Sequence, residues 1–397
     1  MFANKTVVLG ITGSIAAYKA VDLASKLTQA GISVDVVMTK AATEFATPLT
    51  FCHITRRPVT VDMFAPIAEF KPGHVALADR AAVVVIAPAT ANTIAKLAAG
   101  IADDLLSCTV LATEAPLIIA PAMDAGMYQN QVTQENLERL RSRGAIIVGP
   151  AYGRLVSGVM GLGRLAEVDE ILGTIYQVLG RGGDFAGRSL VVSAGGTQEP
   201  LDPVRYLSNR SSGKMGYAIA EAARDRGATV ILISAPTALR PPVGVELVPV
   251  TSALQMCDAV LEKAANADAL IMTAAVADYR PANAAGHKIK RDPESLTLEL
   301  VKNPDILSQV QGELVKVGFA AESEDLVPNA KRKLERKGLD LIVGNDITAA
   351  DSGFAVDTNK VVLIDHSGEV EQLPLLPKSE VAHRILDKVL ALLAARG

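Results

Sequence analysis

The stretch SNRSSGKMGYAIAEAARDRGATVILIS, residues 208–234, decides the fold of the half of the chain that contains it. Its small residues Ser211, Ser212 and Gly213 precede a helical pattern of apolar residues, and the apolar run TVILIS that follows predicts a strand. A strand-like run, SLVVSA, also precedes it. Free backbone N–H groups at the start of such a helix favour an anion. We therefore expect a nucleotide phosphate there, with an ordinary capped helix start as the alternative.

Two other nucleotide sites are disfavoured by the local sequence. A P-loop carries a further Gly five residues before the Gly-Lys pair and a Ser or Thr directly after it, whereas Met215 follows Lys214. An NAD(P) dehydrogenase needs a GxGxxG turn and a matching acidic residue after the second strand, and the chain has neither.

Strands alternate with helical patterns in both halves of the 397-residue chain. This alternation predicts an α/β protein with two doubly wound parallel sheets, and the length also favours two domains. The glycine-rich run GRGGDFAGR is expected to be a linker. The predicted divisions are a domain at 1–179, a linker at 180–188 and a second domain at 189–397. The first domain has expected strands at 6–11, 32–39, 81–90, 115–123 and 145–150.

Composition excludes several classes of protein. The net charge of -4 and a pI of about 5.8 argue against a general binder of nucleic acid or of anionic membranes. Cys52, Cys108 and Cys257 lack metal-site or disulfide spacing and are expected to be buried thiols in a reducing compartment. The amino terminus does not resemble a signal peptide, and no run of 18 uncharged apolar residues occurs. We expect a cytoplasmic protein.

Two clusters of hydroxyl and amide groups follow strands of the first half. GITGSIAAYK places Gly13 and Ser14 at a strand-to-helix turn, and APATANT (87–93) follows a later strand. Ligands of α/β sheets bind at such strand ends. The two clusters together favour a nucleotide-like cofactor.

These and further motifs resemble two enzyme families. GITGSIAAYK, the element around His74, APATANT and PAMDAGMYQN (121–130) resemble the flavin-binding decarboxylases that act on a cysteine. SAGGTQEPLDPVRYLSNRSSGKMG, AAVADYR, KIKR, KNPDI, GFAAE and GNDI resemble the phosphopantothenate-cysteine ligases. Both series occur in order in one chain, as in the bifunctional decarboxylase/ligase enzymes of bacterial coenzyme A synthesis. The resemblance implies a flavodoxin-like flavoprotein domain followed by a Rossmann-like ligase domain.

The resemblance implies an FMN site and a decarboxylase in the first domain. His74 is implied as the proton-transfer residue, a task that suits imidazole because its ordinary pKa lies near neutrality. FMN is implied to oxidise the cysteinyl group to a thioaldehyde, which then loses CO₂ before the hydride returns. The residues implied to line the FMN site are Gly13, Ser14, Thr39, Thr90, Asn92 and Thr93.

Two residues depart from the family pattern at the decarboxylase site. Asp124 stands where the family has an asparagine that donates to the substrate carboxylate. An ionised Asp124 would repel that carboxylate, so its side chain must be protonated, turned away or bridged by another group. Ser157 stands in the expected substrate flap, 154–167, where the family often has a cysteine acid. Serine is a far weaker acid than cysteine. The alternative function is therefore an active ligase whose flavin half is catalytically weak and mainly structural.

The resemblance implies a CTP-dependent ligase in the second domain, with Asn209 holding an acyl-cytidylate and Lys288 supplying a catalytic cation. Lys333 and Lys337 lie four residues apart, hence on one helix face, and are expected to point at one target; a solvated face is the alternative. Asp278 is also a candidate ligand for Mg²⁺. The implied CTP-binding residues are Ser211, Ser212, Gly213, Ala274, Ala275, Val276, Asp278, Lys288, Asn303, Pro304, Asp305, Ile306, Phe319, Lys333 and Lys337.

The expected function is a two-step reaction. The second domain couples 4'-phosphopantothenate to L-cysteine with CTP, and the first decarboxylates the product to 4'-phosphopantetheine. The expected cofactors are FMN and Mg²⁺. The resemblance further implies a homo-oligomer built from trimers of the flavin domain and dimers of the ligase domain, a dodecamer.

Overall fold

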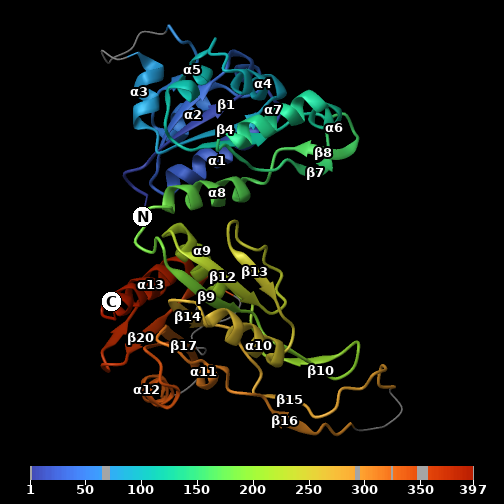
Figure 1. Ribbon diagram of the computed structural model, residues 1–397, viewed down its shortest axis with the longest axis vertical. Helices are drawn as coiled ribbons and strands as arrows, with labels where there is room; N and C mark the ends of the chain where they lie inside the picture. The colour runs from blue at the N-terminus through green and yellow to red at the C-terminus, as the bar shows by residue number, and fades with distance from the viewer. Residues whose placement is uncertain (1, 65–71, 291–295, 323–324, 347–355, 397) are drawn as a thin grey trace. The chain divides into compact units, whose positions relative to one another are not determined.

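The computed structural model describes residues 2–64, 72–290, 296–322, 325–346 and 356–396. The chain forms two compact units, Met1–Leu179 and Gly180–Gly397 (Figure 1). Residues 180–188, expected to be a linker, pack within the second unit. Phe185 is fully buried, and Asp184 forms an ion pair of 2.6 Å with Arg226.

The first unit contains the parallel strands β1 (Thr6–Ile11), β2 (Ser33–Met38), β3 (Val59–Thr60), β4 (Val83–Ala89), β5 (Leu117–Pro121) and β6 (Ile146–Ile147). Their order in the sheet is β3-β2-β1-β4-β5-β6. The predicted doubly wound parallel class is confirmed. The order is that of a Rossmann sheet, whereas a flavodoxin sheet places β1 between β2 and β3. Alternation of strands and helices does not distinguish these two orders.

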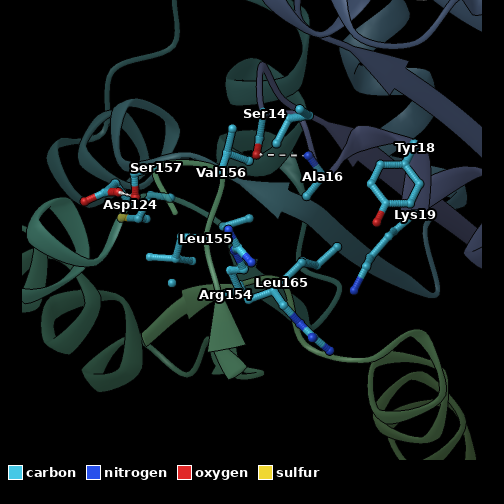
Figure 2. A pocket seen from close by; sticks show the side chains of 15 residues that line it. Ser14, Ala16, Tyr18, Lys19, Asp124, Arg154, Leu155, Val156, Ser157 and Leu165 are labelled. Atoms are coloured by element: carbon cyan, nitrogen blue, oxygen red, sulfur yellow. Dashed lines mark hydrogen bonds between the residues drawn. The ribbon is translucent and has the colours of Figure 1, made fainter. Parts of the chain in front are cut away.

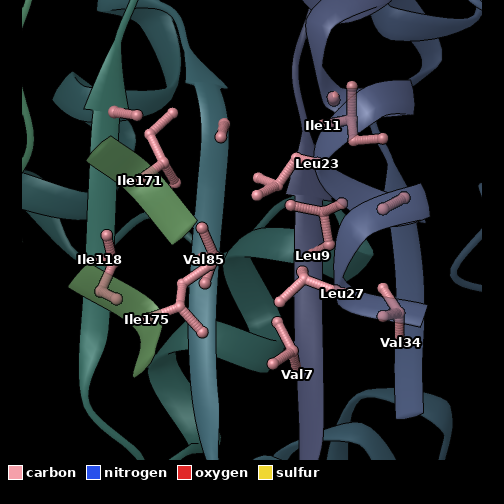
Figure 3. Packing of buried hydrophobic residues seen from close by; sticks show 14 of the residues in the cluster. Val7, Leu9, Ile11, Leu23, Leu27, Val34, Val85, Ile118, Ile171 and Ile175 are labelled. Atoms are coloured by element: carbon pink, nitrogen blue, oxygen red, sulfur yellow. The ribbon is translucent and has the colours of Figure 1, made fainter. Parts of the chain in front are cut away.

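The helices of the first unit are α1 (Ala17–Gln29), η1 (Lys40–Glu44), α2 (Pro48–Thr55), α3 (Gly73–Arg80), α4 (Ala91–Ala99), α5 (Leu105–Ala112), α6 (Ala125–Gln129), α7 (Gln131–Ser142) and α8 (Val168–Gly180). Successive side chains of a strand point to opposite faces of the sheet. Leu9 of β1 therefore belongs to a core with Leu23 of α1 and Ile171 of α8 (Figure 3). Its neighbour Val8 belongs to a second core with Ile94 of α4. A hairpin of β7 (Ala151–Arg154) and β8 (Met160–Arg164) precedes α8.

The main sheet of the second unit consists of β9 (Ser189–Ala194), β12 (Thr229–Ser234), β13 (Glu246–Pro249), β14 (Ala269–Met272), β17 (Val315–Glu322), β18 (Leu341–Asp346), β20 (Val361–Asp365) and β21 (Val370–Gln372). Their order is β13-β12-β9-β14-β17-β18-β20-β21. The first six strands are parallel, and the last two are added antiparallel at one edge. The parallel part has the Rossmann order, as predicted.

The helices of the second unit are α9 (Lys214–Asp225), α10 (Ala253–Ala264), α11 (Ile306–Gln309), α12 (Leu326–Lys337) and α13 (Lys378–Ala394). Helices α9 and α13 share one core with the sheet, and α10, α11 and α12 share another. Gly216 allows α9 to approach the sheet closely, since a Cβ there would lie 2.6 Å from Oγ1 of Thr273 and 2.7 Å from Cβ of Ala194.

Three short antiparallel pairs complete the second unit. They are β10 (Gln198–Pro200) with β11 (Tyr206–Ser208), β15 (Tyr279–Pro281) with β16 (Leu300–Lys302), and β19 (Thr358–Asn359) with β22 (Leu376–Pro377). None of the helices in the described ranges has both the length and the hydropathy of a membrane-spanning helix.

In both sheets the strand order reverses beside the first strand, between β1 and β4 and between β9 and β14. Ligands of doubly wound folds bind beyond the carboxyl ends of the strands at such a point. The candidate sites are therefore sought there.

Candidate active sites

Thr12 joins the carboxyl ends of β1 and β4. Its hydroxyl donates to the carbonyl of Pro88 (2.7 Å) and accepts from the N–H of Thr90 (3.0 Å). Thr12 is only 1% exposed. This buried pair of hydrogen bonds fixes the edge of the sheet where its strand order reverses. Sequence reasoning missed Thr12, although it directly precedes the Gly-Ser turn.

A cavity of about 920 Å³ lies beside this edge, and we call it the threonine cavity. Oγ1 of Thr39 accepts from the N–H of Ala42 at the start of η1, and Oγ1 of Thr90 accepts from the N–H of Thr93 at the start of α4. Both threonines thus bring a helix start to the cavity. Five of the residues implied to bind FMN line it: Gly13, Thr39, Thr90, Asn92 and Thr93.

The threonine cavity also contains a charged group that sequence reasoning did not find. Nζ of Lys96 lies 2.7 Å from Asp103 and 3.3 Å from Asp104. The hydrogen bond to Asp103 raises the pKa of Lys96. Lys96 offsets these two carboxylates. Lys40, Asp62 and several apolar side chains also line the cavity, so it offers a ligand hydroxyl, amide, charged and apolar groups.

A second cavity of the first unit, about 530 Å³, is lined by residues of the 154–157 segment, and we call it the flap cavity (Figure 2). Ser14, the sixth residue implied to bind FMN, lines this cavity and not the threonine cavity. Asp124 and Ser157 lie here as well, together with the cationic side chains of Lys19 and Arg154.

Asp124 and Ser157 form a direct pair. Oγ of Ser157 donates to Oδ2 of Asp124 (2.7 Å), and the N–H of Gly126 donates to Oδ1 (3.1 Å). These two hydrogen bonds, that of Ser157 first, lower the pKa of Asp124. Of the three states considered from the sequence, the structure contains the bridged one. The hydroxyl proton of Ser157 is engaged by Asp124, which is ionised at neutral pH.

His74 lies in the first turn of α3 and is half-buried. It is not among the described residues that line the threonine cavity or the flap cavity. Among the described lining residues, the flap cavity thus contains Asp124 and Ser157 but not His74.

In the second unit, a cavity of about 420 Å³ lies where the strand order reverses, and we call it the serine-glycine cavity. Gly213 takes a left-handed conformation, φ +76°, and a Cβ there would lie 2.7 Å from Cγ2 of Thr237. Nδ2 of Asn209 donates to the carbonyl of Val276 (3.2 Å) and joins the two sides of the cavity. The predicted residues that line it are Asn209, Ser211, Ser212, Gly213, Ala274, Ala275, Val276, Asp278, Phe319 and Lys333.

The two lysines of α12 reach different partners. Nζ of Lys333 donates to the carbonyl of Phe319 (2.6 Å) at the serine-glycine cavity, whereas Nζ of Lys337 pairs with Asp305 (3.1 Å). Helical spacing correctly placed both on one helix, but Asp305, just before α11, attracts Lys337 away from the target of Lys333.

Other predicted nucleotide residues lie outside the lining of this cavity. Asn303 is buried and holds the segment 277–278 in place: its Nδ2 donates to the carbonyl of Ala277 (2.8 Å), and its backbone N–H donates to the carbonyl of Asp278 (2.8 Å), a residue that lines the cavity. Pro304 and Ile306 follow it in the chain and do not line the cavity either.

Lys288 is exposed and is not among the lining residues. The segment that carries it is nevertheless fixed, because Asp202 accepts from the N–H of Ile289 (3.1 Å) and Arg205 donates to the carbonyl of Ile289 (2.6 Å). Arg291 of the KIKR motif and Ile347 of GNDI lie outside the described residues.

Asp278 lines the serine-glycine cavity. Among the residues that the structure describes, no group of three His, Cys, Asp or Glu side chains is arranged to hold a metal ion. Cys52, Cys108 and Cys257 are free thiols; Cys257 is buried as expected, whereas Cys52 and Cys108 are only half-buried. Desolvation raises the pKa of Cys108 and of Cys257.

The sequence matches known families along nearly its whole length. Residues 1–180 match the Flavoprotein family, and residues 185–393 match the DNA/pantothenate metabolism flavoprotein C-terminal domain. The coenzyme A biosynthesis bifunctional protein CoaBC of Vibrio vulnificus (strain YJ016) is 45% identical, over 98% of each chain. The protein of the same name from Bacillus subtilis (strain 168) is 43% identical over 100% of this chain and 99% of that one.

The chain belongs to the family of coenzyme A biosynthesis bifunctional proteins. This confirms the resemblance drawn from the motifs and the prediction of a bifunctional enzyme with a decarboxylase and a ligase activity. A solved structure of the C-terminal domain of a CoaBC protein is 42% identical, covering 53% of this chain and 97% of that one, with a TM-score of 0.46.

Several residues of the second unit line the serine-glycine cavity although the sequence did not predict them as site residues. Lys214 belongs to the stretch 208–234, where its sequence setting excludes a P-loop but does not indicate another role. Asn345, Asn359 and Lys378 also line the cavity, and all three are mostly buried. Asn345 belongs to the GNDI motif, which resembles the ligases but was not assigned to a cavity, whereas Asn359 and Lys378 belong to no such motif and come from separate parts of the chain.

Proposed function

We propose that this chain makes 4'-phosphopantetheine in two steps. The second unit joins 4'-phosphopantothenate to L-cysteine through an acyl-cytidylate formed from CTP, and the first unit decarboxylates the product with FMN. The observation that carries the proposal is the position of two donor-rich cavities, one at the strand reversal of each unit, in a chain of the CoaBC family.

The threonine cavity fits a flavin phosphate. Its hydroxyls and helix starts, at Thr39 and Thr90, are neutral donors, and Lys96 offsets the nearby carboxylates. We propose that these residues, with Gly13, Asn92 and Thr93, hold FMN. We also propose that Ser14, which lines the flap cavity, binds FMN from that side. Bound FMN supplies reversible hydride transfer.

The flap cavity would then hold the cysteinyl end of the substrate. Arg154 and Lys19 offer cations to an anionic substrate, and the bond from Ser157 to Asp124 offsets the charge of Asp124. Because the hydroxyl of Ser157 is a weak acid already engaged by Asp124, we assign proton transfer to His74. That role requires subunit contacts of the proposed trimer, since His74 is not among the described residues that line its own flap cavity.

In the ligase unit, we assign roles to the residues that line the serine-glycine cavity and to Lys288. The amides at Ser211–Gly213 bind the triphosphate, and the backbone of Ala274–Val276 reads the cytosine. Asn209 holds the acyl-cytidylate, and Asp278 contributes to binding Mg²⁺ together with the triphosphate. Lys288 offsets charge on the α-phosphate, which requires its segment to approach the cavity.

The substrates, the assembly and the location of the enzyme are part of the proposal. It works on 4'-phosphopantothenate, L-cysteine and CTP in the cytoplasm, without nucleic acid or membrane. We propose a dodecamer of flavin-unit trimers joined through ligase-unit dimers, with FMN near subunit contacts.

The purified full-length protein tests the proposal in two measurements. Its absorption spectrum should contain the bands of bound flavin. Pyrophosphate release with 4'-phosphopantothenate should be faster with CTP than with ATP. A spectrum without flavin would refute the proposed cofactor, and equal or faster turnover with ATP would refute the proposed nucleotide.

A further inference from the structure

The hairpin of β10 and β11 (198–208) contains a buried carboxylate in its turn. The side chain of Asp202 has no exposed surface. Its Oδ1 accepts from the N–H groups of Val204 (2.8 Å) and Arg205 (2.8 Å), and these two bonds close the turn. Its Oδ2 accepts from Nε (3.0 Å) and Nη2 (2.7 Å) of Arg205. Burying an ionised carboxylate costs free energy unless donors of this kind surround it.

The remaining hydrogen bond of Asp202 reaches outside the hairpin. Oδ2 accepts from the N–H of Ile289 (3.1 Å), and the carbonyl of Ile289 accepts from Arg205 (2.6 Å). Four residues earlier, the N–H of Ala285 donates to the carbonyl of Leu201 (2.9 Å). The turn of the hairpin therefore binds the segment 285–289 at both of its ends.

Lys288 lies inside this bound segment, directly before Ile289. Its side chain is exposed, and among the residues that the structure describes no hydrogen bond or ion pair engages its ammonium. The position of Lys288 therefore depends on how its backbone is held, and Asp202 supplies the buried acceptor next to it.

The same hairpin is fixed at its base and leads into the serine-glycine cavity. The buried Glu199 of β10 accepts from the N–H of Ala253 (2.9 Å) at the start of α10. Strand β11 continues into Asn209, which lines the cavity. Asn209 and Lys288, far apart in the sequence, are thus both attached to one hairpin.

We propose that Asp202 is a positioning residue of the ligase, which holds Lys288 in place relative to Asn209 during cytidylyl transfer. This rests on the proposed function, in which Lys288 offsets charge on the α-phosphate. In that step a carboxylate oxygen of the substrate bonds to the α-phosphorus. The bond from that phosphorus to the bridging oxygen of the β-phosphate breaks, and pyrophosphate leaves with the electron pair. Asp202 acts only through the position of Lys288.

Asp202→Asn tests this role in the full-length protein. An amide has one carbonyl oxygen, which cannot accept both from the turn and from the N–H of Ile289. Pyrophosphate release with 4'-phosphopantothenate should slow about 10- to 100-fold, because a displacement of roughly 1 Å can cost that much in rate. The dissociation constant of CTP, measured by calorimetry, should stay nearly unchanged.

Hydrogen exchange reports the attachment itself. In the unmodified protein the N–H of Ile289 should exchange more slowly than those of His287 and Lys288, for which the described residues contain no acceptor. In Asp202→Asn the three should exchange at similar rates.

A double variant separates positioning from a general structural effect. Lys288→Gln alone should slow pyrophosphate release about 10²- to 10³-fold. If Asp202 acts through Lys288, the variant with both changes should be no slower than Lys288→Gln. Independent effects would instead multiply.

Asp268→Asn is a matched control for lost stability. Asp268 also accepts from a backbone N–H, that of Ser189 (2.7 Å), and from an arginine, Arg188 (2.9 Å), but it does not line the cavity. This variant should melt at a lower temperature and release pyrophosphate at the normal rate. If Asp202→Asn does not fold, Asp202→Ser replaces it, since a serine hydroxyl can still close the turn.

Three results would overturn the role of Asp202: normal pyrophosphate release in its variant, multiplied effects in the double variant, or rapid exchange of the Ile289 N–H in the unmodified protein. Failure of the proposed function looks different. In that case Lys288→Gln would itself release pyrophosphate at the normal rate, or the unmodified protein would release none with CTP.

Discussion

Thr12→Val should both destabilise the first unit and weaken its hold on flavin. Valine keeps the volume of threonine but removes the hydroxyl, which is buried between the carbonyl of Pro88 and the N–H of Thr90. A buried polar group without its partner costs about 1–3 kcal/mol, so the two groups together cost about 2–6 kcal/mol. For a unit of this size, that corresponds to a melting temperature lower by roughly 4–24 °C. Flavin binding should weaken because Thr90 begins α4 at the threonine cavity.

The assay combines thermal unfolding with the flavin content retained after dialysis. Thr28→Val is a matched control, since the hydroxyl of Thr28 donates only to the carbonyl of Ala24 within α1 (2.8 Å) and lies away from the cavity. We expect it to cost less than about 1 kcal/mol and to retain flavin. A Thr12→Val protein with the stability and flavin content of the control would refute the reasoning.

The remaining predictions address catalysis and pH. Lys288→Gln should slow pyrophosphate release by about 10²- to 10³-fold, the cost of one lost oxyanion contact, and unchanged release would identify Lys288 as a surface residue. Formation of 4'-phosphopantetheine should survive Ser157→Ala better than His74→Asn, and Asp124→Asn should leave it intact or raised; the reverse order in flavin-loaded variants would invert the roles. Burial raises the pKa of Asp225 from 3.8 to about 6, so its stabilising contribution is complete below pH 3.8 and is lost as pH rises through 6. Between pH 4.5 and 7 the melting temperature of Asp225→Asn should therefore change less with pH than that of the unmodified protein. The same change with pH in both proteins would contradict this.

Strand ends were the features that the sequence predicted best. Apolar runs bounded by Gly and Thr located β1 and β4, and the residues after them, Gly13 and Thr90, line one cavity. Ser14 follows Gly13 directly but lines the flap cavity, because successive residues of the tight turn before α1 face different sides. Strand order depends on which strands pair, and local patterns do not encode it.

Residues that act through distant partners could not be predicted from local patterns. Helical spacing relates Lys333 to Lys337, but the carboxylate that binds Lys337 is that of Asp305, which lies just before a different helix, α11. Lys378 reaches the serine-glycine cavity only because α13 packs against α9. The bond between Asp124 and Ser157 likewise joins α6 to the hairpin of β7 and β8. Each contact is set by tertiary packing.

The most direct test follows both steps in one vessel. The full-length protein is given 4'-phosphopantothenate, CTP and L-cysteine labelled at its carboxyl carbon, and pyrophosphate and labelled CO₂ are counted together. We predict one CO₂ for each pyrophosphate, with neither released when CTP is omitted. Pyrophosphate without CO₂ would leave the flavin half as a binding module, and CO₂ release independent of CTP would contradict the coupling of the two units' activities.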